Sequence, residues 1–175
     1  LPPALAKQGL DVRLLLPGFP GILDGVRDLR PVLRVGPAFS AAVIDLKLGR
    51  LPGNGLPAYV IDAPFLYRRA GNPYLGPDGL DWRDNHRRFA LLGWMAAHLG
   101  AGELDPDWVP DVVHAHDWHA GLAPVYMAQN PALPAKSVFT VHNLAFRGIF
   151  PLELHPEMHL PLRKITPTGI EFHGK

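Results

Sequence analysis

The side chains with the most chemical potential lie in one stretch, residues 110–124, which reads Pro-Asp-Val-Val-His-Ala-His-Asp-Trp-His-Ala-Gly-Leu-Ala-Pro. A short apolar run there ends abruptly in histidines, an aspartate and a tryptophan. Histidine and aspartate side chains are among the ligands that bind zinc in proteins. The same residue types, joined by tryptophan, also bind carbohydrate through hydroxyl hydrogen bonds and ring stacking.

The elements around this stretch indicate how it is positioned. Val112 and Val113 are β-branched and predict a strand, on which His114 and His116 share one face because side chains alternate. Apolar residues at helical spacing predict a helix over 118–129. The polar cluster therefore lies where a strand passes into a helix, at the edge of an α/β sheet where ligands bind.

A second predicted strand, residues 137–142, also ends in histidine and is followed by Asn143. Two parallel strands joined by a helix of this length require a right-handed crossover, which places their carboxyl ends side by side. We therefore expect His142 and Asp117 to face one crevice.

A metal site is one alternative for the cluster. The order His-Ala-His-Asp-Trp-His is only partly similar to the His-x-His-x-Asp-His of binuclear metallohydrolases, because the aspartate comes one position early. Strand parity also turns Asp117 away from His114 and His116, which disfavours a shared metal.

Other interpretations suit these residues better. His114 is typical of a hydrogen-bonded structural group. Asp117, at a strand end near a helix N-terminus, can be held ionised by backbone N–H groups and directed at sugar hydroxyls. His119 fits either a structural or a binding role, and Trp118 adds a ring for stacking. We find no phosphate-binding glycine loop in the right context and no serine or cysteine nucleophile motif.

Strands and helices alternate in the rest of the chain, so we expect an α/β fold with a mostly parallel sheet and flanking helices. No internal repeat or domain boundary is evident. The remaining sequence after 148 is uninformative apart from a strand-like segment at 170–172. The other predicted elements are a helix over 1–9, strands at 11–16, 33–35, 42–48 and 58–62, a helical turn near 22–26, an irregular loop over 68–81 and a long helix from 84 or 85 to 100 or 102.

Composition excludes several classes of function. The 175 residues carry a formal charge of +1, with 17 basic and 16 acidic side chains, so nothing favours nucleic acid or an anionic membrane as a partner. The chain has no cysteine and no apolar run long enough to span a bilayer, and we expect a soluble, cytoplasmic protein. It begins without Met inside a helix, so we also expect an internal piece of a longer protein.

Several segments closely resemble the ADP-glucose-dependent glycogen/starch synthase family, whose bacterial members are glycogen synthases. The most specific are His-Ala-His-Asp-Trp-His and, further on, Val-His-Asn-Leu-Ala, in that order. The matching segments are Leu14-Leu-Leu-Pro-Gly-Phe, Tyr59-Val-Ile-Asp-Ala-Pro-Phe-Leu-Tyr, Gly71-Asn-Pro-Tyr, Asp84-Asn with Arg88-Phe-Ala-Leu-Leu-Gly, residues 110–124, and Ser137-Val-Phe-Thr-Val-His-Asn-Leu-Ala-Phe-Arg-Gly.

The resemblance implies a Rossmann-like domain of a two-domain GT-B glycosyltransferase. Residues 1–175 would form most of its N-terminal, acceptor-side domain, truncated at both ends and lacking the C-terminal nucleotide-binding domain and the Lys-x-Gly-Gly loop. The implied reaction transfers glucose from ADP-glucose to the non-reducing 4-hydroxyl of glycogen or a maltooligosaccharide, with retention and without cofactor or metal. We expect this chain alone to be inactive.

The resemblance also implies residue roles. Asp117 is similar to the family's active-site aspartate beside the acceptor, and His142 to the histidine that contacts the donor glucose and steadies positive charge at its anomeric carbon. Asn143 adjoins it, and Tyr67 matches a tyrosine lining the cleft. The chain departs from the family pattern at two positions, where Phe65 replaces a frequent histidine and Arg68 a frequent aspartate.

Three alternatives remain open at this point. The first is a GT-B enzyme that uses another sugar nucleotide. The second is a metal-dependent hydrolase, and the third is a glucan-binding module without catalytic activity.

Overall fold

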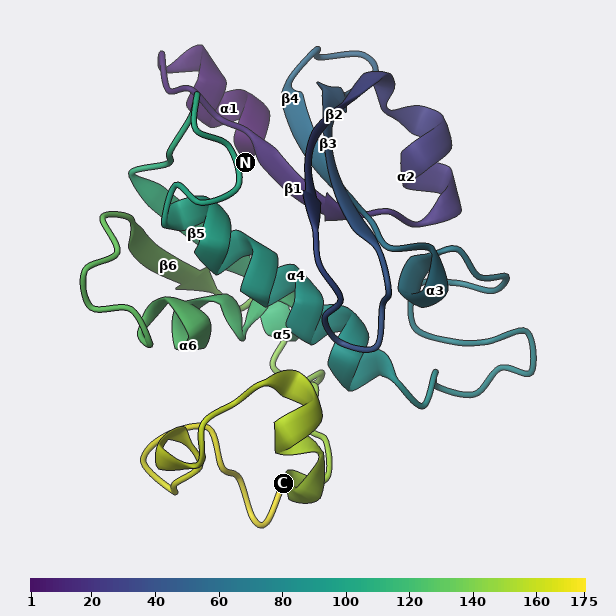
Figure 1. The fold of residues 1–175 in the computed structure, drawn as a ribbon, viewed down its shortest axis with the longest axis vertical. Coiled ribbons are helices and arrows are strands. Elements are labelled where there is room, and N and C mark those ends of the chain that lie inside the picture. The colour runs from purple at the N-terminus through teal and green to yellow at the C-terminus, as the bar shows by residue number, and fades with distance from the viewer. The chain divides into compact units, whose positions relative to one another are not determined.

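A computed structural model describes all residues, 1–175, as two compact units, residues 1–81 and 82–175 (Figure 1). The sequence predicted no boundary, although the glycine- and proline-rich loop over 68–81 ends at it. That loop lacks helix and strand, as predicted, apart from a turn and one isolated bridge between Leu75 and Asp81. No helix in the structure combines the length and apolar character needed to cross a bilayer.

The first unit is built on a four-stranded sheet in the order β1-β4-β3-β2. The β1–β4 pair is parallel, whereas β4–β3 and β3–β2 are antiparallel, so a hairpin extends the parallel part of this sheet. The elements are α1 Pro2–Lys7, β1 Leu14–Pro17, α2 Pro20–Gly25, β2 Arg27–Val35, β3 Ile44–Arg50, β4 Pro57–Asp62 and α3 Pro64–Tyr67.

Strand β2 differs most from the sequence prediction, which placed a strand only over 33–35. Pro31 lies inside β2, where it pairs with Lys47, and the register shifts between Pro31 and Leu33. Proline has no N–H to donate, and an edge strand tolerates it because one side of the strand needs no partner. The prediction was wrong because β2 is the edge strand of the sheet.

The core of the first unit lies along β4, whose residues from 58 to 62 are buried between β1 and β3. Ala58 and Val60 pack with Val26 and with side chains of β1 and α2. Gly18, directly after β1, passes so close to β4 that a Cβ there would lie 2.6 Å from the Ile61 carbonyl oxygen. This strand carries the chain to Asp62 and then to α3.

The second unit combines one long helix with a two-stranded parallel sheet, β5–β6. Helix α4 packs against α5, α6, β5 and η1 (Figure 1). The α/β class is therefore confirmed, with parallel pairs in both units. The elements are α4 Asn85–Gly100, β5 Val112–His116, α5 Asp117–Ala120, α6 Ala123–Met127, β6 Lys136–Thr140 and the 3-10 helices η1 Leu152–Met158 and η2 Leu162–Lys164.

Two predictions for this unit were wrong. The single helix expected over 118–129 is divided into α5 and α6, because Pro124 cannot occupy a helix interior and instead lies in the first turn of α6. Residues 170–172 form no strand. At the α5–α6 junction α4 approaches closely, since a Cβ on Gly93 would lie 2.8 Å from the Ala123 nitrogen.

Candidate functional site

The candidate site lies where β5 and β6 end. The two strands pair in parallel, with His114 opposite Val138 and His116 opposite Thr140. Their carboxyl ends are therefore adjacent, as the crossover argument predicted. The residues that follow each strand, Asp117 on one side and His142 on the other, come into direct contact.

Asp117 joins the two strand ends. Its Oδ1 atom accepts hydrogen bonds from the backbone N–H groups of His142, at 2.7 Å, and Asn143, at 3.3 Å. The His142 N–H bond is the main reason that the pKa of this carboxyl lies below its usual range. The sequence predicted an ionised carboxylate held by N–H groups. The groups come from the loop after β6 rather than from the helix that Asp117 begins.

The backbone of Asp117 is unusual, with a φ of 54° in the left-handed region. Aspartate reaches this region more readily than most residues, at a modest cost in free energy. The turn begins α5 directly after β5 and directs the carboxylate across to the neighbouring strand end. Because Oδ1 takes both backbone bonds, Oδ2 makes no hydrogen bond within the protein.

Three histidines form a column beside this contact. The rings of His114 and His116 stack with centroids 4.2 Å apart, and those of His116 and His142 with centroids 5.3 Å apart. Nε2 of His114 lies 2.7 Å from Oγ1 of Thr140, so His114 is hydrogen-bonded as predicted, and its structural role stays a prediction. Nδ1 of His116 lies 3.1 Å from Nε2 of His142.

The column is an arrangement of hydrogen bonds and stacked rings. The pKa of His116 is lowered first by burial and then by its neighbours His114 and His142, against the opposing charge of Asp117. The contact between His116 and His142 needs a donor nitrogen on one ring and an acceptor nitrogen on the other, and a neutral imidazole offers one of each. No group of three or more histidine, aspartate or glutamate side chains is placed to hold a metal ion.

Trp118 and His119 belong to an aromatic cluster on α5 and α4. The Trp118 ring lies 4.8 Å from Phe89 and 5.9 Å from Phe150, measured between centroids, and His119 lies 5.2 Å from Phe89. Burial lowers the pKa of His119, against the opposing charge of Asp117. Both side chains thus help to support α5, and their contact with substrate stays a prediction.

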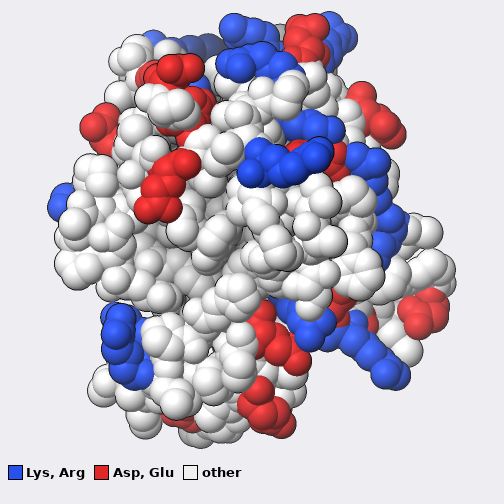
Figure 2. All heavy atoms as spheres, in the orientation of Figure 1, with Lys and Arg blue, Asp and Glu red and all other residues white.

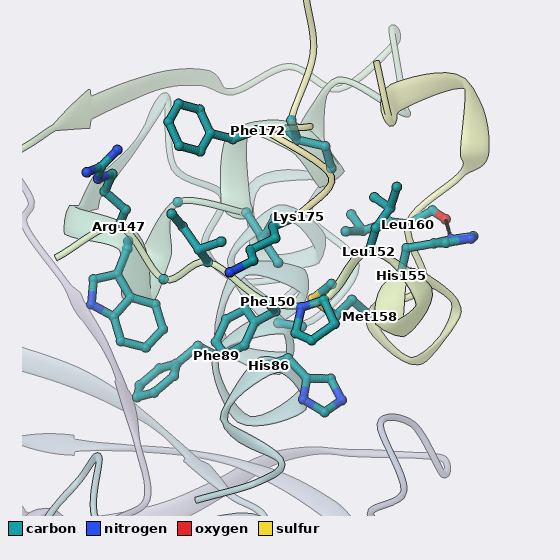
Figure 3. A pocket seen from close by; sticks show the side chains of 18 of the residues that line it. His86, Phe89, Arg147, Phe150, Leu152, His155, Met158, Leu160, Phe172 and Lys175 are labelled. Carbon is teal, nitrogen blue, oxygen red and sulfur yellow. Dashed lines mark hydrogen bonds between the residues drawn. The ribbon is translucent and has the colours of Figure 1, made fainter. Parts of the chain in front are cut away.

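A pocket of about 420 Å³ opens next to this aromatic cluster (Figure 3). Its wall is largely apolar and includes Trp118, Phe150 and Phe172, the last two from the region after 148 that was uninformative in sequence. His86 also lines the pocket. Its Nε2 atom binds Glu157 at 2.6 Å, and its buried Nδ1 has no hydrogen-bond partner.

Tyr67 lies in the first unit, at the end of α3, where it is buried and packs edge-on against Phe19 with 5.4 Å between ring centroids. The departures beside it have clear structural consequences. Arg68 donates to both carboxylate oxygens of Asp62, at 3.1 and 2.6 Å, and Lys47 adds a third bond at 2.7 Å. Phe65 is exposed.

The sequence did not reveal that His116 takes part in the site. Its place on the same strand face as His114 was readable from the two-residue period. Its contact with His142 depends on the register of a strand that is distant in sequence.

On the face of the molecule that Figure 2 presents, basic and acidic side chains are interspersed around uncharged areas.

Comparisons with known proteins bear on the same residues. The family model described as starch synthase catalytic domain matches residues 1–175. A glycogen synthase from Francisella philomiragia is 44% identical over 179 residues, covering 100% of this chain and 37% of that protein. One from Francisella tularensis subsp. novicida is also 44% identical over 179 residues, with 100% and 36% covered.

The fold has a solved counterpart as well. The catalytic domain of starch synthase IV from Arabidopsis thaliana, bound to ADP and acarbose, superposes with a TM-score of 0.77 at 24% identity over 99% of this chain and 35% of that chain. The chain spans a little more than a third of the length of the curated relatives. With the family model matched from end to end, the chain belongs to the starch synthase catalytic domain family.

Proposed function

We propose that residues 1–175 are part of the N-terminal, acceptor-side catalytic domain of a glycogen or starch synthase. The enzyme would transfer glucose from ADP-glucose to the non-reducing 4-hydroxyl of an α-1,4-glucan, with retention at the anomeric carbon. The observation that carries this proposal is the bond from the His142 N–H to the Asp117 carboxylate. It brings the two most specific motifs of the family together at one edge of a parallel sheet, where α/β proteins bind ligands.

Asp117 is suited to hold a sugar hydroxyl. Its lowered pKa keeps the carboxylate ionised at neutral pH, and Oδ2 is left to accept a hydrogen bond from a ligand. The same low pKa makes it a weak base, so it is a poor group to take the proton of the attacking hydroxyl. This favours a route in which the departing phosphate oxygen of the donor takes that proton.

His142 would act at the donor glucose. Its side chain is exposed, while its backbone is bound to Asp117 and its ring to His116. A ring held in this way can contribute electrostatic stabilisation to positive charge at the anomeric carbon without having to reorganise. Asn143 bonds through Oδ1 to the Ala145 N–H at 2.9 Å, which leaves its side-chain nitrogen as a donor for a sugar hydroxyl. Trp118 and His119 would line the cleft beside these residues, and for Tyr67 a cleft-lining role is implied by the resemblance to the family alone.

The partners in this proposal are ADP-glucose and a glucan such as glycogen or a maltooligosaccharide. The bound ADP of the Arabidopsis structure supports the donor, since ADP is the product that transfer from ADP-glucose releases. Most of the nucleotide would be held by parts of the longer protein outside these residues. The reaction would need no cofactor, and a chain without cysteine suits the reducing cytoplasm as its location.

The direct test uses the full-length protein. Purified enzyme should release ADP from ADP-glucose in the presence of maltooligosaccharide, and extend the oligosaccharide by α-1,4-linked glucose. UDP-glucose should be turned over much more slowly, and a chelator should leave the rate unchanged. Preference for another sugar nucleotide would indicate a different GT-B enzyme. Glucan binding without turnover of any sugar nucleotide would favour a binding module.

A further inference from the structure

The most informative unassigned contact in the structure joins His116 to His142. Nδ1 of His116 and Nε2 of His142 are 3.1 Å apart, and the two rings are inclined by only 26°. A hydrogen bond between two imidazole nitrogens requires that one carries the proton and the other does not. The contact therefore links the protonation of the two nitrogens, since one must donate and the other accept, and it also orients the rings.

His116 is itself anchored to the β5–β6 ladder. It ends β5, opposite Thr140, and its ring stacks on His114 at 4.2 Å. His114 is in turn bound to the Thr140 hydroxyl of the neighbouring strand. Both supports of the His116 ring thus belong to regular secondary structure, whereas His142 lies two residues beyond β6.

An exposed histidine in a loop would otherwise sample several rotamers. The backbone of His142 is fixed by its N–H bond to Asp117, but that bond leaves the ring free to rotate. Only the contact with His116 restrains the ring within this group of residues. It occupies Nε2 of His142 and leaves Nδ1 as the nitrogen that can meet a ligand.

We propose that His116 is a positioning residue, which holds the ring of His142 in the orientation and tautomer needed at the reacting sugar without itself touching substrate. This inference rests on the proposed function, because it concerns the same sugar-transfer site. A misplaced group at the reacting centre lowers turnover far more than it weakens substrate binding. Loss of the contact should therefore appear in kcat.

The test compares three substitutions in the full-length enzyme. His116→Asn keeps a hydrogen-bonding atom close to the place of Nδ1. His116→Gln moves such an atom toward the place of Nε2, and His116→Phe keeps a stacking ring with no hydrogen bond. We expect Phe and Gln to lower kcat by about tenfold, as expected for one lost hydrogen bond, and Asn to retain most of it. The KM for ADP-glucose should change by less than about twofold, since uniform binding is unaffected.

His98→Phe is the matched control. His98 lies near the end of α4, where it contacts Trp94 and Glu103 outside the histidine column, so its replacement should leave kcat unchanged. Thermal unfolding midpoints show whether each variant is folded. If His116→Phe does not fold, the comparison of the Asn and Gln variants still shows whether the hydrogen bond at Nδ1 matters or only the volume of the side chain.

Two results would overturn the proposal. One is a folded His116→Phe or His116→Gln enzyme with the kcat of the parent, and the other is an Asn variant as slow as Phe. Crystal structures provide a readout that does not depend on activity, because the His142 ring should be displaced in the Phe and Gln variants and keep its place in the Asn variant. If the parent enzyme does not turn over ADP-glucose, the proposed function fails, while an unmoved His142 ring would separately refute the positioning role.

Discussion

Replacement of Gly148 by alanine should distort the support of the site in a way that can be worked out from the structure. A Cβ at this position would lie 2.2 Å from Cε3 and 2.6 Å from Cδ2 of Trp118, far inside van der Waals contact. The indole has little room to yield, because it packs on Phe89 at 4.8 Å and on His119 at 4.3 Å between ring centroids. Trp118 also directly follows Asp117, so its displacement pulls on the carboxylate that binds His142.

Two costs add in this variant. Gly148 has a φ of 59°, and an L-residue in that left-handed conformation costs about 1–2 kcal/mol. Overpacking against Trp118 adds about 1–3 kcal/mol. The free energy of unfolding should therefore fall by about 2–5 kcal/mol. A matched control is Gly55→Ala, because Gly55 has a similar φ of 67° but nothing within 4 Å of the added methyl group.

Thermal and urea unfolding of the two full-length variants measure the difference. Gly55→Ala should show the backbone cost alone, and Gly148→Ala should be less stable than this control by the overpacking cost of about 1–3 kcal/mol. Turnover of ADP-glucose should also fall in Gly148→Ala and stay unchanged in Gly55→Ala. Equal stability of the two variants, or full activity of Gly148→Ala, would refute the packing argument.

Two further predictions concern the same unit. Tyr126→Phe removes a buried hydroxyl that donates to the Met158 carbonyl, and this should lower the free energy of unfolding by about 1–3 kcal/mol. The control Tyr74→Phe changes an exposed side chain and should not lower it. Equal unfolding midpoints for the two variants would contradict this prediction. Because the pKa of Asp117 is lowered, its bond to the His142 N–H should persist above the ordinary aspartate pKa of about 3.9 and be lost as pH falls through the lower value in the fold. Hydrogen-exchange protection of the His142 N–H should fall in this acid range. The side chain of Asp117→Asn cannot titrate, so an equal fall in that variant would show that protonation of Asp117 is not the cause.

Sequence patterns predicted the site best where it depends on the alternation of side chains along a strand and on the right-handed crossover between parallel strands. The two strands, the shared face of His114 and His116 and the meeting of Asp117 with His142 all follow from alternation and from a right-handed crossover. The donors that hold Asp117 could not be predicted, because they belong to a loop whose position depends on how β6 pairs with β5.

The errors have different physical origins. The strand predicted over 33–35 was too short, because an edge strand tolerates a proline such as Pro31 and the position of a strand in a sheet is not a local property. The break before Pro124 was readable from the absence of a proline N–H, yet apolar spacing alone predicted a continuous helix. The pocket wall after 148 has no periodicity that any local rule could use.

The most direct test of the proposed site is His142→Ala in the full-length enzyme. Steady-state ADP release should give kcat, and binding of glycogen should be measured separately at equilibrium. Since we place His142 at the reacting sugar, kcat should fall by on the order of a hundredfold, while glycogen affinity stays nearly the same. A variant that keeps the kcat of the parent and loses only affinity for glycogen would contradict the account.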